Sequence, residues 1–401
     1  MLEKPPVLAE LGIKSPLGRK LKALADAFLL PLVLSAIAVA GTAFSYLFFH
    51  VFAELFSIVI ASTALIVVAT SRRFTKNNYL VFVASLIGWC AVVDLLHMVT
   101  YKGMTLTPFQ SSNTATQFWV LARSLQAAGL LLAPYYLRRE LSFARLHAAL
   151  ALLVGLGVAS IGYGWFPDCY VEGQGLTAFK IYTEYAIIVV LAASGWRLWR
   201  NRQSMPRPLL WGMTAAIFTM MLSEFALTLY VDINAPANLL GHVLKFFAYW
   251  FIYLALIETT LRKPFEMLAS AANTYDAVPD PTLVVSADGI ILEANRAAAM
   301  LVGSTAEQLR GSSSHLLFHD AQLPQEKCPV CNALLKSRER FVMDILVKHG
   351  ARTIECNVAP LLGQREQDLF VQLLRDTTAQ KAVEAERDRL LEQLRRQQAR
   401  A

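Results

Sequence analysis

The first 261 residues contain eight runs of mostly apolar residues, each roughly 20 residues long. A helix needs about 20 such residues to cross the hydrocarbon core of a bilayer. The sequence therefore predicts an all-α bundle of eight transmembrane helices. The first run does not read as a signal peptide, because it begins well inside the chain and seven similar runs follow it. The runs are 27–49, 52–70, 79–99, 115–137, 147–166, 179–199, 208–230 and 237–261.

Basic residues gather in every second loop between these runs, and this asymmetry predicts the orientation. Short loops rich in Lys and Arg stay on the cytoplasmic side of a membrane. Both termini are therefore predicted to be cytoplasmic, and the net charge of +7 is mostly this topology signal, which gives no reason to expect a nucleic-acid partner. The basic residues are Arg19, Lys20 and Lys22; Arg72, Arg73 and Lys76; Arg138, Arg139 and Arg145; Arg197, Arg200, Arg202 and Arg207; and Arg262 and Lys263.

Ionisable residues of the apolar runs map to one depth, near the predicted outer ends of the helices. A charged side chain in hydrocarbon costs about 2.5 kcal/mol or more, so such groups face the bundle interior, pair or bind something. Independent polar residues would scatter over both leaflets, and these do not. The residues are Glu54, Asp94, His97, Arg123, Glu184, Glu224, His242 and Lys245, with His50 at the turn expected before the second helix.

Two interpretations of this cluster stay open. In the first it is a structural network of buried ion pairs, with Asp94–Arg123 and Glu224–Lys245 as the expected pairs. In the second it binds a ligand, a proton, or a metal ion or haem through the three histidines, His50, His97 and His242.

Four separated segments within the apolar region resemble the MASE3 membrane-associated sensor domain. They are Leu47–Ser57, Asp94–Met104, Gln117–Arg123 and Asn238–Lys245. The resemblance implies a multi-pass input domain in the bacterial inner membrane, attached to a histidine kinase of a two-component system or to a cyclase that makes cyclic di-GMP. Its motifs hold eight of the candidate ligand-binding residues, whereas Glu184 and Glu224 rest on depth alone. The eight are His50, Glu54, Asp94, His97, Trp119, Arg123, His242 and Lys245.

Beyond Arg262-Lys263-Pro264 the sequence reads as an ordinary globular domain. A helical connector at 263–274 is predicted to continue from the last apolar run. Residues 283–295 alternate as two strands joined by an Asp288-Gly289 hairpin turn. A helix is expected at 296–302, a turn and helix start at 303–311, and strands at 341–347, 353–358 and 369–374, with a second turn at His349-Gly350.

This order of elements resembles a PAS domain over residues 275–378. The specific matches are the hairpin turn, Glu293-Ala-Asn295 and Arg375-Asp-Thr-Thr378. The resemblance implies an α+β fold that relays a signal into a following helix. It leaves open whether this domain binds a ligand: the flavin motif Asn-Cys-Arg-Phe-Leu-Gln is absent, and His315 and His319 are weak candidates for haem.

Cys328-Pro-Val-Cys331 is the sharpest chemical motif of the cytoplasmic part. Such a pair is either a redox couple, half of a metal site, or simply the start of a helix. A four-ligand zinc site would need another pair with clear spacing, which the sequence does not show. Cys328 and Cys331 are therefore predicted as a redox pair at most.

Residues 379–401 read as a charged helix with a narrow apolar stripe at Val383, Leu390, Leu391 and Leu394, which predicts either a coiled coil between two copies or a single solvated helix. We find no kinase, cyclase or DNA-binding motif, and therefore expect a sensor region that is not itself an enzyme and whose output domain lies elsewhere. The alternatives are a transporter gated by the PAS domain and a haem- or metal-dependent membrane redox protein.

The sequence thus predicts five parts. They are a cytoplasmic segment (1–26), the membrane bundle (27–262), the connector (263–274), the PAS domain (275–378) and a signalling helix (379–401).

Overall fold

The computed structural model describes residues 16–72, 77–229, 236–319, 324–336, 343–349, 352–361 and 369–398. The chain divides into two compact units, Met1–Pro264 and Phe265–Ala401, and each is described by itself below. We call them the helical unit and the α+β unit. Residues 1–15 of the predicted cytoplasmic segment, Gly350 of the predicted second turn and the first two residues of the predicted 341–347 strand lie outside the described residues.

Eight long helices make up the described part of the helical unit. Seven of them are long and apolar enough to cross a membrane, the last as part of a longer helical stretch. The exception is α4, which carries Gln117, Arg123 and Gln126, all buried among the other helices, so its polar residues do not face lipid. The helices are α1 (Pro16–Ala40), α2 (Tyr46–Ser71), α3 (Asn78–Thr100), α4 (Ser112–Leu132), α5 (Phe143–Gly162), α6 (Ala178–Arg200), α7 (Arg207–Thr228) and α8 (Pro236–Ile257).

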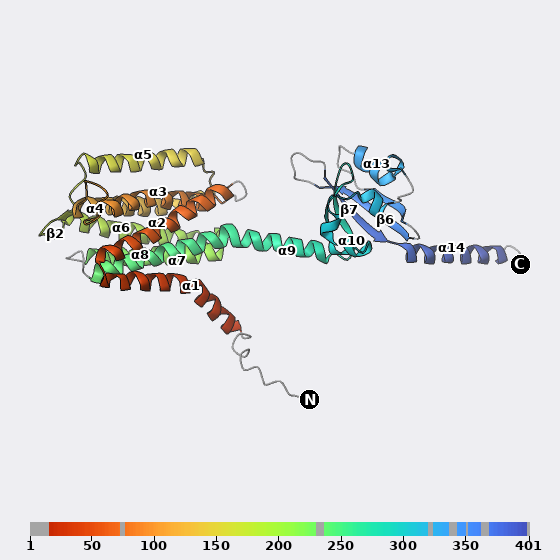
Figure 1. The fold of residues 1–401 in the computed structure, drawn as a ribbon, viewed down its shortest axis with the longest axis horizontal. Coiled ribbons are helices and arrows are strands. Elements are labelled where there is room, and N and C mark those ends of the chain that lie inside the picture. Colours follow the sequence, from red (N-terminus) through yellow and green to blue (C-terminus); the bar gives the residue numbers. More distant parts are fainter. Residues whose placement is uncertain are drawn as a thin grey trace, which may run out of the picture. The chain divides into compact units, whose positions relative to one another are not determined.

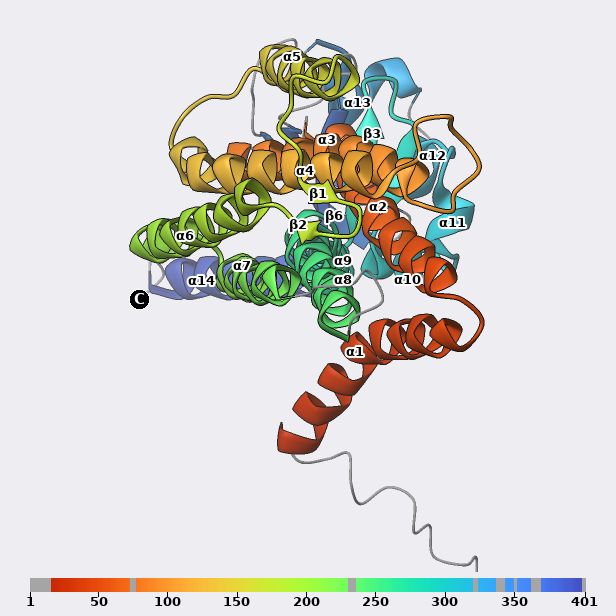
Figure 2. The ribbon, with the colours of Figure 1, turned by 90° about the vertical axis from the view of Figure 1, so that its left-hand side faces the viewer.

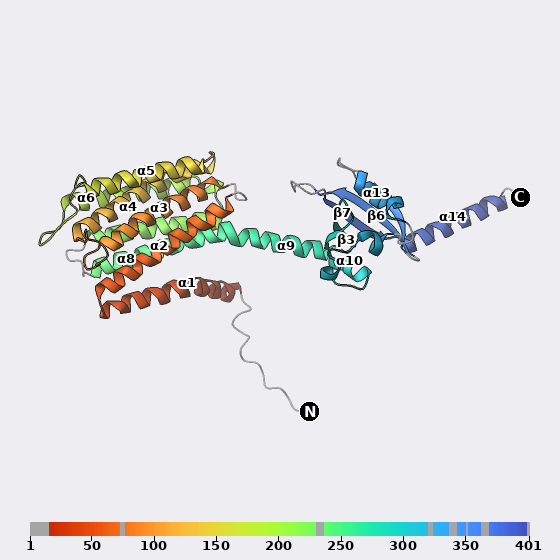
Figure 3. The ribbon, with the colours of Figure 1, turned by 45° about the horizontal axis from the view of Figure 1, so that its top comes forward.

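Six of these helices pack as a closed ring in the order α2–α3–α4–α6–α7–α8, with α8 returning to α2. The other two lie outside it: α5 packs on α3 and α4, and α1 packs on α2 and α8. Figures 1 and 3 show α1 and α5 on opposite sides of the bundle. Most residues of α3 are buried, whereas most of α1 and α5 are not. The interior of the ring is therefore the place where polar side chains can avoid lipid.

The first two helices meet earlier than the sequence predicted. The predicted break at residues 50–51 was wrong, because a 3-10 turn, η1 (Gly41–Ala43), ends the first helix and Ser45 begins the second. The Ser45 side chain accepts a hydrogen bond from the Phe48 backbone N–H, which caps α2. Apolar residues continue through this break, so hydropathy alone does not reveal it. His50 consequently lies inside α2 and not in a turn.

A small hairpin lies between α5 and α6 and was missed by the sequence analysis. It pairs β1 (Tyr170–Val171) with β2 (Gly175–Leu176) in antiparallel fashion. Asn113 at the start of α4 holds the base of this hairpin. The Asn113 side chain accepts a hydrogen bond from the Cys169 backbone N–H and donates one to the Asp168 carboxylate at 2.7 Å. We call this end of the helical unit the hairpin end; Figure 2 looks toward it.

Gly212 lets α7 and α8 approach closely, which gives a test of the packing. A Cβ at this position would lie 2.7 Å from the Ala255 Cβ and 3.3 Å from the Phe251 carbonyl oxygen, whereas a Cβ at Gly155 of α5 would meet nothing within 4 Å. We expect Gly212→Ala to lower the free energy of unfolding by about 1–3 kcal/mol. Gly155→Ala should be neutral or stabilising by up to about 1 kcal/mol. Denaturant unfolding in micelles measures both, and equal effects would contradict this packing.

A π-helical turn, η4 (Glu258–Arg262), follows α8, and α9 (Lys263–Ala277) follows the turn. Helical structure therefore runs from Pro236 to Ala277 with one irregular turn, in agreement with the predicted connector. Turns of this kind are rare and occur frequently at functional sites.

The α+β unit contains a five-stranded antiparallel sheet in the order β4-β3-β7-β6-β5. The predicted Asp288-Gly289 turn is confirmed, with Gly289 at φ 76° between β3 and β4. The strands are β3 (Thr282–Ser286), β4 (Ile291–Ala294), β5 (Met343–His349), β6 (Arg352–Pro360) and β7 (Leu369–Asp376). The helices are α10 (Arg296–Leu301), α11 (Ala306–Leu309), α12 (Ser314–Phe318) and α13 (Pro329–Lys336), and η5 (Gln325–Lys327) is a 3-10 turn.

Buried Asn295 joins the beginning of this unit to its first helix. Its side chain caps α10 by accepting from the Ala298 backbone N–H, accepts from the Thr282 backbone N–H, and donates to carbonyls of the preceding segment. At the other end of the unit, the Asp376 carboxylate accepts from the backbone and side chain of Thr378, where α14 (Thr378–Gln398) begins. Both motifs that the sequence analysis singled out thus hold the ends of the fold.

Candidate functional site

Every buried charged side chain in the described residues of the helical unit belongs to one cluster inside the ring. Each of the six ring helices contributes to it. Its ionisable members are His50 and Glu54 of α2, Asp94 and His97 of α3, Arg123 of α4, Lys180 and Glu184 of α6, Glu224 of α7, and His242 and Lys245 of α8. All ten are 5% exposed or less, so bulk water screens their interactions little.

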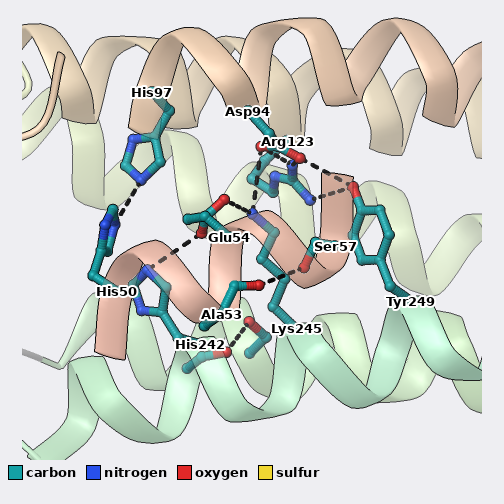
Figure 4. A network of polar contacts seen from close by, with 12 residues as sticks. His50, Ala53, Glu54, Ser57, Asp94, His97, Arg123, His242, Lys245 and Tyr249 are labelled. Atoms are coloured by element: carbon teal, nitrogen blue, oxygen red, sulfur yellow. Dashed lines mark hydrogen bonds and ion pairs between the residues drawn. The ribbon is translucent and has the colours of Figure 1, made fainter. Parts of the chain in front are cut away.

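Three histidines and one carboxylate converge at the hairpin end of this cluster. The ligand atoms of His50, Glu54, His97 and His242 all lie within 4.8 Å of one another. The Nε2 atoms of His50 and His97 are 3.1 Å apart and share a hydrogen bond, and His242 Nε2 lies 3.5 Å from the Glu54 Oε1. Figure 4 shows these side chains pointing toward one another from three helices.

The backbone fixes which nitrogen two of these histidines present to the centre. His97 Nδ1 donates to the Ala115 carbonyl at 2.7 Å, and His242 Nδ1 donates to the Asn238 carbonyl at 2.9 Å. In a neutral imidazole the opposite nitrogen then carries a lone pair. Metal-binding histidines are held in the same way. The remaining ring, His50, stacks on Tyr101 with 3.7 Å between the ring centroids.

An ion-pair chain extends from the histidines deeper into the ring (Figure 4). Lys245 Nζ lies 2.6 Å from Glu54 Oε2 and 3.4 Å from Asp94 Oδ1. Arg123 contacts both oxygens of Asp94, at 2.5 and 2.6 Å, and the Tyr249 hydroxyl donates to Asp94 at 3.2 Å. The predicted Asp94–Arg123 pair is therefore present. The predicted Glu224–Lys245 pair was wrong, because Lys245 reaches across to α2 and α3 instead.

Glu184 and Glu224, which the depth argument alone had selected, are buried members of the cluster from α6 and α7. Lys180 Nζ is 2.7 Å from Glu184 Oε1 and also donates to the Leu227 carbonyl at 2.7 Å. The Trp119 ring takes part here too, since both Arg123 and Lys245 lie over it, at 5.0 and 4.7 Å from its centroid.

Sequence reasoning missed Lys180 and Tyr249. Lys180 is four residues before Glu184 on α6, and this i,i+4 spacing was the available signal for a pair. Tyr249 is seven residues after His242 and four after Lys245, hence on the same face of α8. Its hydroxyl contacts Asp94 and Arg123, but a tyrosine in an apolar run gives no comparable signal.

A cavity of about 30 Å³ adjoins the histidines and is lined on its other sides by residues such as Tyr101, Tyr170 and Lys180. This volume suits an ion or one or two water molecules. It is far too small for a porphyrin, and the 3.1 Å contact between two Nε2 atoms leaves no space for one. The site therefore fits a single metal ion and not the haem considered from sequence.

The predicted redox pair of the α+β unit has unexpected neighbours. Cys328 and Cys331 are buried free thiols, and their sulfur atoms face His315 and His319. Hydrogen bonds from Cys331 and His319 lower the pKa of the Cys328 thiol to about 3, although burial opposes this. The same contact with Cys328, together with burial, raises the pKa of Cys331. The sequence analysis was wrong in finding no second ligand pair.

Comparison with protein families agrees with both resemblances. Residues 42–264 match MASE3, described as a membrane-associated sensor domain, and residues 275–382 match a PAS fold. Both matched domains are sensory. No curated protein has a sequence that matches this chain.

Solved structures similar to part of this chain include PAS domains. The PAS domain of an HTR-like protein from Haloarcula marismortui is 21% identical, covers 28% of this chain and 98% of its own, and has a TM-score of 0.24. The PAS domain of BvgS from Bordetella pertussis is 23% identical over 32% of this chain and 98% of its own, with a TM-score of 0.24. The photoactive yellow protein domain of the sensor histidine kinase Ppr from Rhodospirillum centenum is 15% identical. It covers 26% of this chain and 91% of its own, with a TM-score of 0.21.

Proposed function

The chain belongs to the MASE3 family of membrane-associated sensor domains, and we propose that it senses a divalent transition-metal ion in the ring of helices. The convergence of His50, Glu54, His97 and His242, with all four ligand atoms within 4.8 Å of one another, carries this proposal. Imidazole nitrogens suit zinc, copper, iron and nickel, and three imidazoles with one carboxylate complete a four-coordinate site.

The cluster holds four carboxyl side chains and three cationic ones. A divalent ion at the histidines would compete directly with Lys245 for Glu54, whose oxygens face Lys245 on one side and His242 on the other. The carboxylates are Glu54, Asp94, Glu184 and Glu224, and the cations are Arg123, Lys180 and Lys245.

Protons compete with the metal at this site. Because His97 Nδ1 donates to a carbonyl, the hydrogen bond between His50 and His97 places a proton on His50 Nε2. Binding a metal through all three Nε2 atoms requires that proton to move to His50 Nδ1 or to leave the site. Metal affinity should fall when the pH is low enough to protonate the imidazoles, because only neutral imidazoles bind metal.

Helix α8 offers a route from the site to the rest of the chain. His242, Lys245 and Tyr249 lie on one face of it, and the chain continues from α8 through the π-turn η4 into α9. We infer that metal binding weakens the Glu54–Lys245 contact and shifts α8, and that η4 accommodates the shift. Such a switch requires only that the two positions of α8 bind the metal with different affinities.

The remaining parts of the proposal follow from the matched domains. The helical unit would cross the bacterial inner membrane eight times, with both termini in the cytoplasm. The PAS domain would pass the signal to α14, whose side chains Val383, Leu390, Leu391 and Leu394 are all 46% exposed or more. A second copy covering this stripe would form a homodimer, and a kinase or diguanylate cyclase domain would receive the signal.

Removing one histidine tests the proposed site. In lipid nanodiscs, with Cys328→Ser and Cys331→Ser present to eliminate thiol ligands, His97→Ala should weaken zinc binding at least about 100-fold, since even outer-shell changes cost 10–100-fold. The control is His147→Ala: His147 lies on α5, accepts from the Trp89 indole and is outside the cluster. Competition with a chromophoric chelator measures both affinities. Equal affinities for the two variants would refute the metal site.

A further inference from the structure

We propose that the PAS domain contains a second, structural metal site in which His315, His319, Cys328 and Cys331 bind one zinc ion. This inference concerns the α+β unit and does not depend on the metal site of the helical unit. The four side chains are buried, and their ligand atoms all lie within 4.8 Å of one another.

The distances match a tetrahedral zinc site. Zinc lies about 2.3 Å from a thiolate and about 2.0–2.1 Å from an imidazole nitrogen, so sulfur and nitrogen on a tetrahedron are about 3.6 Å apart. The Cys331 Sγ is 3.5 Å from His315 Nδ1 and 3.6 Å from His319 Nδ1, and the Cys328 Sγ is 3.7 Å from His319 Nδ1. Three separate pairs thus have the separation that one shared ion would impose.

The chain supplies the ligands as two closely spaced pairs. His315 and His319 are four residues apart. His315 lies in α12 and His319 follows its last residue, and the centroids of the two rings are 5.8 Å apart. Cys328 precedes α13 and Cys331 lies in its first turn, an arrangement in which the Asn332 backbone N–H bonds back to the Cys328 carbonyl. Two cysteines three residues apart and two histidines four residues apart have the spacings of the pairs in Cys₂His₂ zinc sites, here with the histidine pair first.

Burial distinguishes this cluster from a surface redox pair. Cys328 and Cys331 are 1% exposed, His315 is 4% exposed and His319 is fully buried, and both cysteines pack in the same core as Phe318 and Cys356. A reactive cysteine pair needs partial exposure to meet its partner thiols. A buried set of two thiols and two imidazoles is instead what a closed metal site provides, because all four ligands belong to the protein.

Binding would join two short helices that already pack in one hydrophobic core. α12 has five residues and α13 has eight, and zinc would link the end of one to the start of the other. Zinc binds thiolates and neutral imidazoles, so each thiol that is protonated beforehand releases its proton to solvent and no electron is transferred. The free energy of metal binding would then stabilise the folded arrangement of α12 and α13.

The test uses the full chain purified in detergent. Wild type should retain about one zinc equivalent that the Cys328→Ser/Cys331→Ser double variant loses. Cys356→Ala is the matched control, because Cys356 is a buried thiol of the same core outside the four-residue set. Cobalt substitution gives an independent readout on wild type: a thiolate-to-cobalt charge-transfer band reports this site alone, since the histidine cluster of the helical unit contains no cysteine.

Each outcome decides the question. Loss of zinc in the double variant, retention in Cys356→Ala and a cobalt–thiolate band in wild type support the site. If the double variant fails to fold, the cobalt band of wild type and faster alkylation of its thiols after chelation still test it. A disulfide between Cys328 and Cys331, or iron with acid-labile sulfide in place of zinc, would overturn the proposal, as would wild type without bound metal and without a cobalt band.

Discussion

Arg123→Met should lower the free energy of unfolding of the helical unit by about 3–5 kcal/mol, the range observed when one partner of a buried ion pair is removed. Arg123 is 3% exposed and holds both oxygens of Asp94, which is fully buried. Without the guanidinium, the polar partners left to Asp94 among the described residues are Lys245 and the Tyr249 hydroxyl. Denaturant unfolding in micelles, followed by the fluorescence of the tryptophans, measures the change.

An exposed ion pair provides the control for Arg123→Met. Lys102 and Glu172 are 2.7 Å apart, yet their side chains are 61% and 70% exposed, and Lys102→Met should change stability by less than about 1 kcal/mol. Adding Asp94→Asn to Arg123→Met should recover part of the loss, because the uncompensated carboxylate is then gone. Equal effects of Arg123→Met and Lys102→Met would show that the Asp94–Arg123 pair is not buried as described.

Lys245→Met should raise the affinity of the helical unit for zinc at least about tenfold while destabilising the metal-free protein. The Lys245 ammonium lies 2.6 Å from Glu54, one of the proposed ligands, and repels any cation bound there. A unit charge about 4 Å away is worth up to about 4 kcal/mol at an effective dielectric constant of 20, more than the 1.4 kcal/mol that a tenfold change needs. Zinc should therefore restore the stability that the substitution removes.

This prediction separates a metal site from a network that only holds the helices together. If the cluster were only structural, Lys245→Met would destabilise the protein and metal would not rescue it. The affinity is measured by chelator competition in the Cys328→Ser/Cys331→Ser background, with Lys102→Met as the control of equal charge. An affinity that is unchanged or lower in Lys245→Met would contradict the competition between Lys245 and metal for Glu54.

Hydropathy and charge were enough to find most of this architecture. Charged residues in apolar runs avoid lipid by facing the interior of the helix bundle. Depth alone was therefore enough to place Asp94, Arg123, His242 and Lys245 together inside the bundle. The same reasoning could not choose partners, since pairing depends on how the helices are ordered around the ring. Lys245 faces Glu54 and Asp94 because α8 packs against α2, a contact that no loop length or periodicity indicated.

Features that depend only on neighbouring residues could be predicted from the sequence. The Asp288-Gly289 turn and the cap at Asn295 follow from the chemistry of a few neighbouring residues, and both are present. The four-ligand cluster of the PAS domain shows the opposite case. His319 and Cys328 are separated by a loop, and only the fold of that loop shows that their side chains meet. Neither pair by itself shows that the other one completes the set of four ligands.

X-ray absorption of the zinc-loaded protein in nanodiscs, with Cys328→Ser and Cys331→Ser present, tests the central claim most directly. A metal held by His50, Glu54, His97 and His242 predicts a first shell of nitrogen and oxygen only, at about 2.0–2.1 Å, with outer-shell scattering from imidazole rings. That scattering should fall in His97→Ala and stay the same in His147→Ala. Absence of bound zinc, or bound zinc without imidazole scattering, would contradict a metal-sensing site in the ring of helices.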